Sequence, residues 1–405
     1  MQDDPDDRWR ADDEPAEPAA EPRSPGRARR PLALLAAGIV LVATLIGVVA
    51  LSRRSTPIHR SDPTVEAWVP YWALDASVPD LALDVALPHT VSPFWFSATS
   101  ATAIGPDANA PADATASFLR SAASGGLAVV PSVFDGMPAG GMAAVISDPT
   151  SRAAHVDALV AFAAAGRYAG LDLDYEQFAF ADPRSSWATT RPHWVEFVTE
   201  LANRLHADGR TLTVSVPPVY DQGRTDDSGY WVYDYAGIAA AVDRIRVMAY
   251  DYSTSTPGPI APLDWVKRSV DGAARASGAR DKLALGVPLY GYNWVTSTVG
   301  TCPATAETGR ATVTQRDLAD LISRRAASPV YDPVTGESSF SYTLPVTDAT
   351  NSCTQQRTVR FIDAAGTMAR IQIARDAGFG AISLWAMGYE EPTFWDRLAG
   401  PDGVG

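Results

Sequence analysis

Short apolar runs recur along the chain from Val65 onward, at intervals that suit alternating strands and helices. Several runs are continuously apolar, which is typical of parallel strands buried on both faces. We predict strands at 65–71, 90–96, 127–133, 170–175, 211–216, 245–250, 283–289 and 381–386. Segments with helical periodicity lie between them, among them 151–165, 194–207 and 367–377.

This alternation predicts an α/β protein, most directly a (β/α)8 TIM barrel over residues 64–400. The alternative is a doubly wound open sheet, which would usually bring a glycine-rich phosphate loop, and the sequence has none. In a TIM barrel the catalytic residues lie at the carboxyl ends of the strands. Reactive side chains at those ends are therefore the candidates for a site.

The segment 295–365, between the seventh and eighth predicted strands, is too long for a single helix. A turn sequence at 332–336 and alternating segments at 338–344 and 357–362 predict a small β-rich insertion on the active-site face. The segment holds both cysteines of the chain, Cys302 and Cys353. In an exported protein they could form a disulfide that closes the insertion, and the alternative is two separate buried thiols.

The pattern differs before residue 64. Residues 1–30 are rich in Asp, Glu, Pro and Arg and are expected to be a disordered acidic tail. Residues 31–52 carry no charged side chain, which predicts one transmembrane helix, and 53–63 read as a polar linker. Arginines at 27, 29 and 30 favour a cytoplasmic N-terminus, although those at 53, 54 and 60 weaken the bias.

The alternative for residues 31–52 is a cleaved signal peptide, with an unusually long and acidic n-region. Under either interpretation, residues from about 55 onward lie outside the cytoplasmic membrane. We therefore expect a single-pass membrane protein with a cytoplasmic N-terminus and an extracytoplasmic catalytic domain.

Composition excludes some classes of function. The net charge of −14 argues against nucleic-acid binding, which needs a concentrated basic surface. The 11 tryptophans are many for 405 residues, and a surplus of tryptophan suits stacking against sugar rings. The five histidines are scattered and neither cysteine has zinc-like spacing, so we expect no metal and no cofactor.

The most informative stretch is the fourth predicted strand, where Asp172, Asp174 and Glu176 alternate with Leu173 and Tyr175. Alternate side chains of a strand point to the same side, so the three acids share one face. Gathering three carboxylates is costly unless they are hydrogen-bonded or share protons, which is characteristic of a catalytic site. A solvated strand face and a calcium loop are the alternatives, although a calcium loop would want a glycine within the run.

Three motifs resemble glycoside hydrolase family 18, the chitinase-like hydrolases. That family carries D-G-x-D-x-D-x-E on the fourth strand, matched by A-G-L-D-L-D-Y-E at 169–176. Its M-x-Y-D on the sixth strand is matched at 248–251, and its eighth-strand tryptophan by Trp385. The resemblance covers about residues 65–398. Within the family, residues 286–294 and 385–390 look like the branch that includes bacterial spore-cortex peptidoglycan hydrolases, although we see no LysM-type repeat.

The resemblance implies hydrolysis of a β-glycosidic bond beside an N-acetylated sugar, with the substrate's own acetamide as nucleophile. Glu176 is the expected general acid and then base. Asp174 would orient the acetamide N–H, Tyr250 would hydrogen-bond its oxygen, and Trp385 would form an apolar floor under the sugar.

Further residues are weaker candidates. Asp172 would pair with Asp174, or is a structural acid of the barrel. Asp251 would contact the sugar or Glu176, or only caps a strand end. Ser132 is expected to hydrogen-bond the acids. Tryptophans near strand ends are expected either to line subsites or to pack in the core, namely Trp72, Trp95 and Trp294.

One position departs from the family pattern, because Ala169 stands where the family has its first Asp. In the family that Asp ends a carboxylate relay, so we expect retained activity with a shifted pH profile. The resulting hypothesis is a glycosidase acting on N-acetylglucosamine-containing glycans of the chitin or peptidoglycan type. The alternatives are a non-catalytic, lectin-like glycan binder on the same barrel and a structural protein of the cell wall. The presence of Glu176 favours the enzyme.

Overall fold

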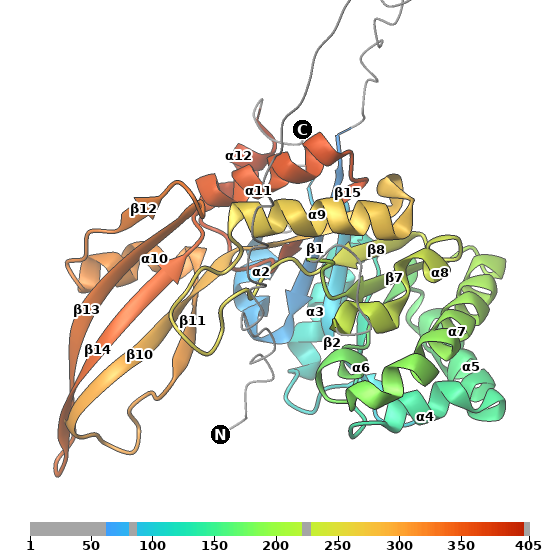
Figure 1. Cartoon of the computed structure of the whole chain (residues 1–405), viewed down its shortest axis with the longest axis horizontal. Coiled ribbons are helices and arrows are strands. Elements are labelled where there is room, and N and C mark those ends of the chain that lie inside the picture. Colours follow the sequence, from blue (N-terminus) through green and yellow to red (C-terminus); the bar gives the residue numbers. More distant parts are fainter. Residues whose placement is uncertain (1–61, 81–86, 221–227, 401–405) are drawn as a thin grey trace, which may run out of the picture. The chain divides into compact units, whose positions relative to one another are not determined.

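The computed structural model describes residues 62–80, 87–220 and 228–400, and its core is a closed barrel of parallel strands (Figure 1). Neighbours around the barrel run in the order β1, β15, β9, β8, β7, β6, β5 and β2, and β1 pairs with β2 to close it. The strands are β1 (Thr64–Pro70), β2 (Thr90–Ala98), β5 (Ser132–Asp135), β6 (Gly170–Asp174), β7 (Thr211–Val216), β8 (Arg244–Val247), β9 (Leu283–Pro288) and β15 (Ala381–Trp385). The predicted TIM barrel is confirmed.

The third predicted strand is the one that differs most from its predicted range. Residues 127–133 hold two short strands, β4 (Ala128–Val129) and the start of β5. Pro131 separates them, because proline has no amide proton to donate to a ladder. A further short strand, β3 (Ile104–Pro106), pairs antiparallel with the end of β2.

The helices alternate with the strands in sequence, and most are placed around the barrel, whereas α10 lies beside it (Figure 1). They are α2 (Leu74–Asp80), α3 (Ala112–Ser124), α4 (Gly141–Ser147), α5 (Pro149–Gly166), α6 (Gln177–Phe180), α7 (Trp187–Ala207), α8 (Tyr235–Ala239), α9 (Leu263–Ser277), α10 (Gln315–Arg324), α11 (Ala364–Ala377) and α12 (Phe394–Leu398). Single 3-10 turns are η1 (Tyr71–Ala73), η2 (Arg184–Ser186), η3 (Gly229–Tyr233) and η4 (Arg280–Lys282).

All three predicted helices are present, and α7 begins earlier than its predicted start at 194. It runs through Pro192, although an interior proline removes a helical hydrogen bond. Trp187 explains the earlier start, since its side chain is buried and its indole Nε1 donates to the Phe178 carbonyl oxygen at 2.6 Å.

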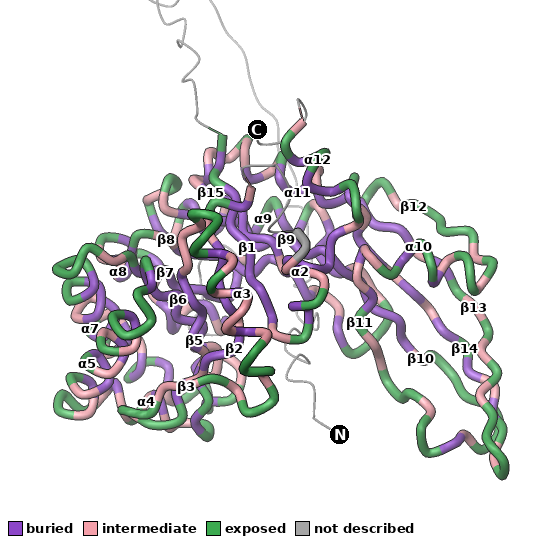
Figure 2. Tube along the Cα trace, turned by 180° about the vertical axis from the view of Figure 1, so that it is seen from behind, coloured by how far each residue is buried: buried purple, intermediate pink, exposed green. Residues whose placement is uncertain are grey.

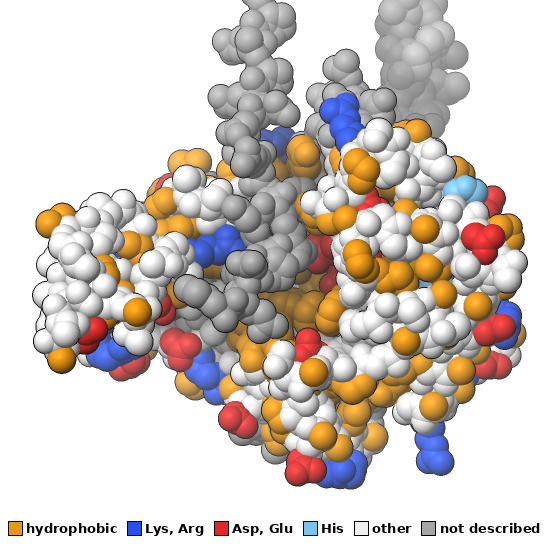
Figure 3. Space-filling model, turned by 90° about the horizontal axis from the view of Figure 1, so that it is seen from below, with side chains coloured by type: hydrophobic (Ala, Val, Ile, Leu, Met, Phe, Trp, Pro, Cys, Tyr) orange, Lys and Arg blue, Asp and Glu red, His pale blue; other side chains and the backbone are white. Residues whose placement is uncertain are grey.

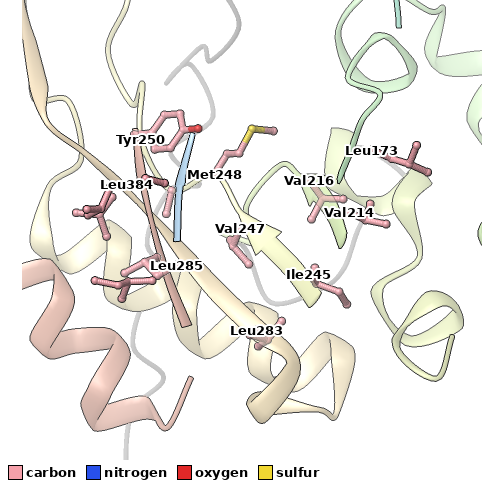
Figure 4. Packing of buried hydrophobic residues seen from close by; sticks show 14 of the residues in the cluster. Leu173, Val214, Val216, Ile245, Val247, Met248, Tyr250, Leu283, Leu285 and Leu384 are labelled. Atoms are coloured by element: carbon pink, nitrogen blue, oxygen red, sulfur yellow. The ribbon is translucent and has the colours of Figure 1, made fainter. Parts of the chain in front are cut away.

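The hydrophobic core lies between the barrel wall and the surrounding helices. Its strand residues include Leu173, Val214, Val216, Ile245, Val247, Leu283, Leu285 and Leu384 (Figure 4). The residues that alternate with them point to the barrel interior, and many of these are polar, such as Asp172, Ser215 and Arg246. The strands are therefore buried on both faces, as their pattern predicts, but the interior face also carries polar side chains that hydrogen-bond to one another.

The segment between β9 and β15 forms a second sheet, which lies beside the barrel (Figure 1). Its antiparallel order is β11 (Arg310–Thr314), β10 (Tyr290–Thr301), β14 (Ser352–Phe361), β13 (Glu337–Thr347) and β12 (Val330–Asp332). α10 packs on it through Leu318 and Leu321. The far end of β10 is exposed and that of β13 alternates between exposed and half-buried residues, whereas the barrel strands are mostly buried (Figure 2). The sheet begins at Tyr290, before the expected boundary at 295, because β10 follows β9 almost directly.

A disulfide and the contacts of one buried carboxylate hold this insertion together and to the barrel. Cys302 and Cys353 form a disulfide with their Cα atoms 4.7 Å apart. The buried Glu337 carboxylate accepts backbone N–H bonds from Ile260 and Ala261 and pairs with Arg370 Nη2 of α11 at 3.2 Å. The start of β13 is therefore fixed to the loop after β8 and to the helix before β15.

Within the described ranges, no helix is both long and apolar enough to cross a bilayer. The predicted tail at 1–30, the predicted transmembrane segment at 31–52 and the linker up to residue 61 lie outside those ranges.

Candidate active site

The three acids on and just after the fourth barrel strand become more exposed along the chain. Asp172 and Asp174 face the interior of β6, with 0% and 4% of their surfaces exposed. Glu176 follows two residues later, just beyond the strand end, and is partly exposed. The row therefore runs from a fully buried carboxyl group to one that a bound molecule can reach.

Asp172 is hydrogen-bonded by four donors inside the barrel. Its Oδ2 atom accepts from Ser132 Oγ at 2.6 Å, Arg246 Nη1 at 3.0 Å and Trp68 Nε1 at 3.2 Å. Its Oδ1 atom accepts from Ser215 Oγ at 2.8 Å. The expected contact of Ser132 with the acids is present, and the arginine explains how a fully buried carboxylate is tolerated.

Arg246 links Asp172 to a second buried acid, Glu66 of β1. Arg246 Nε lies 2.8 Å from Glu66 Oε2, and Arg244 Nε lies 3.0 Å from Glu66 Oε1. Burial alone would raise the pKa of Glu66, but the two guanidinium groups, with hydrogen bonds from Arg246 and Ser383, hold it below its usual value. Two acids and two arginines thus form a charge-balanced network beneath the site.

Sequence reasoning missed Glu66 and Arg246. Each is a single charged residue within an apolar run, in V-E-A-W-V and I-R-V-M. A charged residue in a buried strand needs an ionic partner. The opposite charges of these two residues were therefore the signal from which their pairing could have been predicted.

The M-A-Y-D segment comes directly after β8. Tyr250 is buried, and its ring packs closely on β9 because Gly286 has no side chain: a Cβ there would lie 2.9 Å from the ring. Asp251 has a positive φ of 59° and accepts hydrogen bonds from the hydroxyls of Tyr290 and Tyr292, the latter at 2.7 Å. Burial first, and then Asp251, raises the pKa of Tyr290 well above its usual range, so this hydroxyl stays a donor.

An aromatic group forms the other side of the site. Trp385 ends β15, is partly exposed and packs edge-on against Trp68 and Phe94, with ring centroids 5.7 and 4.8 Å away. Trp72 follows β1, is 54% exposed and donates from Nε1 to the Tyr389 hydroxyl at 2.7 Å. Trp385 therefore presents a partly exposed aromatic ring at the end of β15, and Trp72 presents an exposed one after β1.

Strand β1 points downward in Figure 1, so a view from below faces the carboxyl ends of the barrel strands. In that view the molecule has a hollow beside the insertion (Figure 3). Acidic and hydrophobic side chains are visible inside it. Within the described part of the chain, no group of three or more His, Cys, Asp or Glu side chains is arranged to hold a metal ion.

Two of the three candidate tryptophans outside the motifs are buried. Trp95 is 1% exposed and packs on Phe118 of α3, with ring centroids 6.0 Å apart, so it belongs to the core. Trp294 is also buried, and its Nε1 donates to the Thr254 carbonyl oxygen at 2.7 Å, which holds the loop after β8. Of the two alternatives for these residues, their burial favours core packing over the lining of a subsite.

The expectation of retained activity with a shifted pH profile, which rests on Ala169, stays a prediction, and the position of this residue bears on it. Ala169 is exposed at the amino end of β6, at the opposite end of the strand from Glu176. Its backbone N–H donates to the Val129 carbonyl oxygen, and its own carbonyl accepts from Thr211. Asp172 takes its hydrogen bonds from other residues, so a shorter side chain at position 169 does not disturb the acids.

Comparison with known proteins identifies a family and several relatives. The family model of glycosyl hydrolases family 18 matches residues 116–390. A cortical fragment-lytic enzyme of Bacillus subtilis is 27% identical over 241 residues, which cover 58% of this chain and 50% of that protein. The chain spans about half the length of two of the curated relatives that it matches.

Solved structures share the fold. A chitinase from Chromobacterium violaceum superposes with a TM-score of 0.68 at 25% identity, covering 82% of this chain and 97% of the other. The spore cortex-lytic enzyme of Bacillus megaterium gives a TM-score of 0.67 at 14% identity over 84% of this chain and 74% of the other, which is evidence for the fold alone.

Proposed function

Since this chain belongs to glycosyl hydrolases family 18, we propose that it hydrolyses β-linked glycans that contain N-acetylglucosamine, with retention and with substrate assistance. The observation that carries the proposal is the row of acids on β6. Only its last member, Glu176, is partly exposed at the strand end, while the two behind it are buried. A single reachable carboxyl group in this row suits a mechanism in which one carboxyl group is the general acid and no second carboxylate is needed as nucleophile.

In this mechanism the substrate's 2-acetamido carbonyl attacks C1 as Glu176 protonates the leaving oxygen. The glycosidic bond breaks, and an oxazolinium ion forms. Glu176, now a carboxylate, removes a proton from the incoming water, which opens the ring and restores the acid. Asp174 orients the acetamide N–H, and the Tyr250 hydroxyl bonds the acetamide oxygen.

The remaining groups hold these residues and the sugar in place. Trp385 supplies the floor under the distorted ring, and Trp72 stacks a more distant sugar at the rim. Asp172 acts through its neighbours, because Arg246 and three neutral donors keep it fixed behind Asp174. Asp251 keeps Tyr290 and Tyr292 beside Tyr250.

The proposed substrates are of the chitin or peptidoglycan type, and the proteins that this chain resembles include a chitinase and a cortical fragment-lytic enzyme. A non-catalytic glycan binder was the alternative, and the departure at Ala169 was the feature in its favour. Since Ala169 lies away from the acids, that support is lost. Product analysis after incubation with purified peptidoglycan and with chitooligosaccharides tests the substrate.

A Glu176→Gln variant tests the acid. The amide keeps the shape but carries no transferable proton, so hydrolysis should fall by at least ~10²-fold while glycan binding persists. A variant within about tenfold of wild type would refute the assignment.

We also propose that residues 31–52 anchor the enzyme in the cytoplasmic membrane with the barrel outside. The uncharged run supports an anchor, and the Cys302–Cys353 disulfide supports an oxidising compartment. Membrane fractionation with N-terminal sequencing is the test. A soluble form that begins near Leu51 would show that the run is a cleaved signal peptide.

A further inference from the structure

Glu176 lies between a strand and a helix, where the backbone hydrogen bonds of the sheet end and those of the helix begin. Strand β6 ends at Asp174, and α6 begins at Gln177. On the downstream side, the Glu176 carbonyl oxygen accepts from Ala179 and Phe180 N–H groups at 3.1 and 3.3 Å. On the upstream side lies the carbonyl of Tyr175, which is past the end of the strand ladder.

The hydroxyl of Tyr233 meets that upstream carbonyl. It donates to the Tyr175 oxygen at 2.7 Å, inside the core. The peptide that this bond holds is the one between Tyr175 and Glu176, so it sets the direction in which the Glu176 side chain leaves the backbone. Orientation of this kind can govern a rate, since a misplacement of about 1 Å can cost ~10²-fold.

Tyr233 is itself rigidly placed. It ends η3, and its ring packs between Phe178 and Trp194 at centroid distances of 6.0 and 5.7 Å. Trp194 Nε1 also donates to the Tyr233 carbonyl oxygen at 3.0 Å. The turn lies directly against α6, since a Cβ at Gly229 would be 2.8 Å from the Ala179 Cβ.

The charges around Tyr233 keep its hydroxyl a donor. Burial first, and then the carboxylates of Glu176 and Asp174, raise the pKa of Tyr233 well above its usual range. Both acids are therefore near enough to act on this hydroxyl, which places it behind the reacting groups rather than in a remote part of the core.

We propose that Tyr233 is a positioning residue for the general acid: its hydroxyl fixes the Tyr175–Glu176 peptide and thereby aims the Glu176 carboxyl at the leaving oxygen. This inference rests on the proposed function, in which Glu176 protonates that oxygen. Tyr233 touches neither substrate nor reacting atoms in this role.

The chain offers a matched control two residues away. Tyr235 is also a buried tyrosine, and its hydroxyl donates to a backbone carbonyl, that of Pro217, at 2.6 Å. Tyr233→Phe and Tyr235→Phe each remove one buried hydroxyl and one hydrogen bond to a carbonyl. Their effects on the unfolding midpoint should be similar, and only the first should disturb the acid.

The experiment measures kcat/KM for wild type, both Phe variants and Glu176→Gln on two substrates. One is an unactivated N-acetylglucosamine oligosaccharide, and the other is a glycoside of the same sugar with a 2,4-dinitrophenolate leaving group. That leaving group departs without protonation, so a defect in the acid shows mainly on the oligosaccharide.

We expect Tyr233→Phe to lose about ten- to a hundredfold in kcat/KM on the oligosaccharide and less than about threefold on the dinitrophenyl glycoside. Tyr235→Phe should stay within about threefold on both. Equal losses on both substrates, or a Tyr233→Phe variant that matches Tyr235→Phe, would overturn the inference and leave the function intact. If Glu176→Gln retains wild-type activity or wild type cleaves neither substrate, the proposed function fails and this inference with it.

Discussion

Replacement of Arg246 by Met should destabilise the barrel severely. Arg246 is completely enclosed and lies 2.8 Å from Glu66 Oε2 and 3.0 Å from Asp172 Oδ2. Methionine fills a similar volume but removes the guanidinium that pairs with Asp172 and leaves Glu66 with that of Arg244 alone. Removing one partner of a buried ion pair costs about 3–5 kcal/mol, so the free energy of unfolding should fall by at least that amount near pH 7.

The loss of stability in the Arg246→Met variant should depend on pH. In wild type the pKa of Glu66 lies below its usual value, so its pairing stabilises the fold above that value and is lost as the pH falls. Without Arg246, burial of Glu66 favours its neutral form. The deficit of the variant should therefore be largest near neutral pH and should shrink as the pH is lowered toward 4.

Urea denaturation at several pH values is the assay, and Arg268→Met is the matched control. Arg268 pairs with Asp264 at 2.8 Å on the surface of α9, where both side chains are exposed, so its loss should cost below ~0.5 kcal/mol. An Arg246→Met variant that loses less than about 1 kcal/mol would refute the claim that an ionic network fills the barrel interior.

Two further predictions concern single side chains. Burial first, and then Asp182, raises the pKa of Asp135 to about 6, so Asp135→Asn should raise the free energy of unfolding by about 2–3 kcal/mol at pH 7.5. Because a raised pKa stabilises the fold only at low pH, that gain should vanish near pH 4 in urea titrations, and a gain independent of pH would contradict the assignment. Trp72→Ala should raise KM for an oligosaccharide with little change in the unfolding midpoint, whereas Trp95→Ala should lower stability by about 3–5 kcal/mol; steady-state kinetics and thermal unfolding of both variants separate the two roles.

The barrel strands could be located from the sequence where a glycine or proline marks the end of the strand. Strand β7 falls at the predicted 211–216 because Gly209, with a φ of 70°, precedes it and Pro217 follows it. The row of acids on β6 was visible for a similar reason, since alternation along one strand is a local property. The contact of Ser132 with Asp172 followed from the order of parallel strands.

Features that depend on distant pairing were not visible. The partner of Arg246 is Glu66, 180 positions away, and nothing in either run specifies the other. The sequence left Trp95 open between a subsite and the core, because the register between β2 and β5 shifts between Phe94 and Phe96 and this irregularity has no local signal. The role of Tyr233 depends on a turn that comes 58 residues after the carbonyl it binds.

The central claim is that a sugar acetamide, rather than a protein carboxylate, attacks the anomeric carbon while Glu176 protonates the leaving oxygen. A pair of aryl glycosides that differ only at C2, with acetamido in one and hydroxyl in the other, tests it most directly. The account predicts that wild type cleaves the acetamido glycoside and leaves the hydroxyl glycoside intact. Efficient cleavage of the hydroxyl glycoside would contradict it, because a protein carboxylate would then have to be the nucleophile.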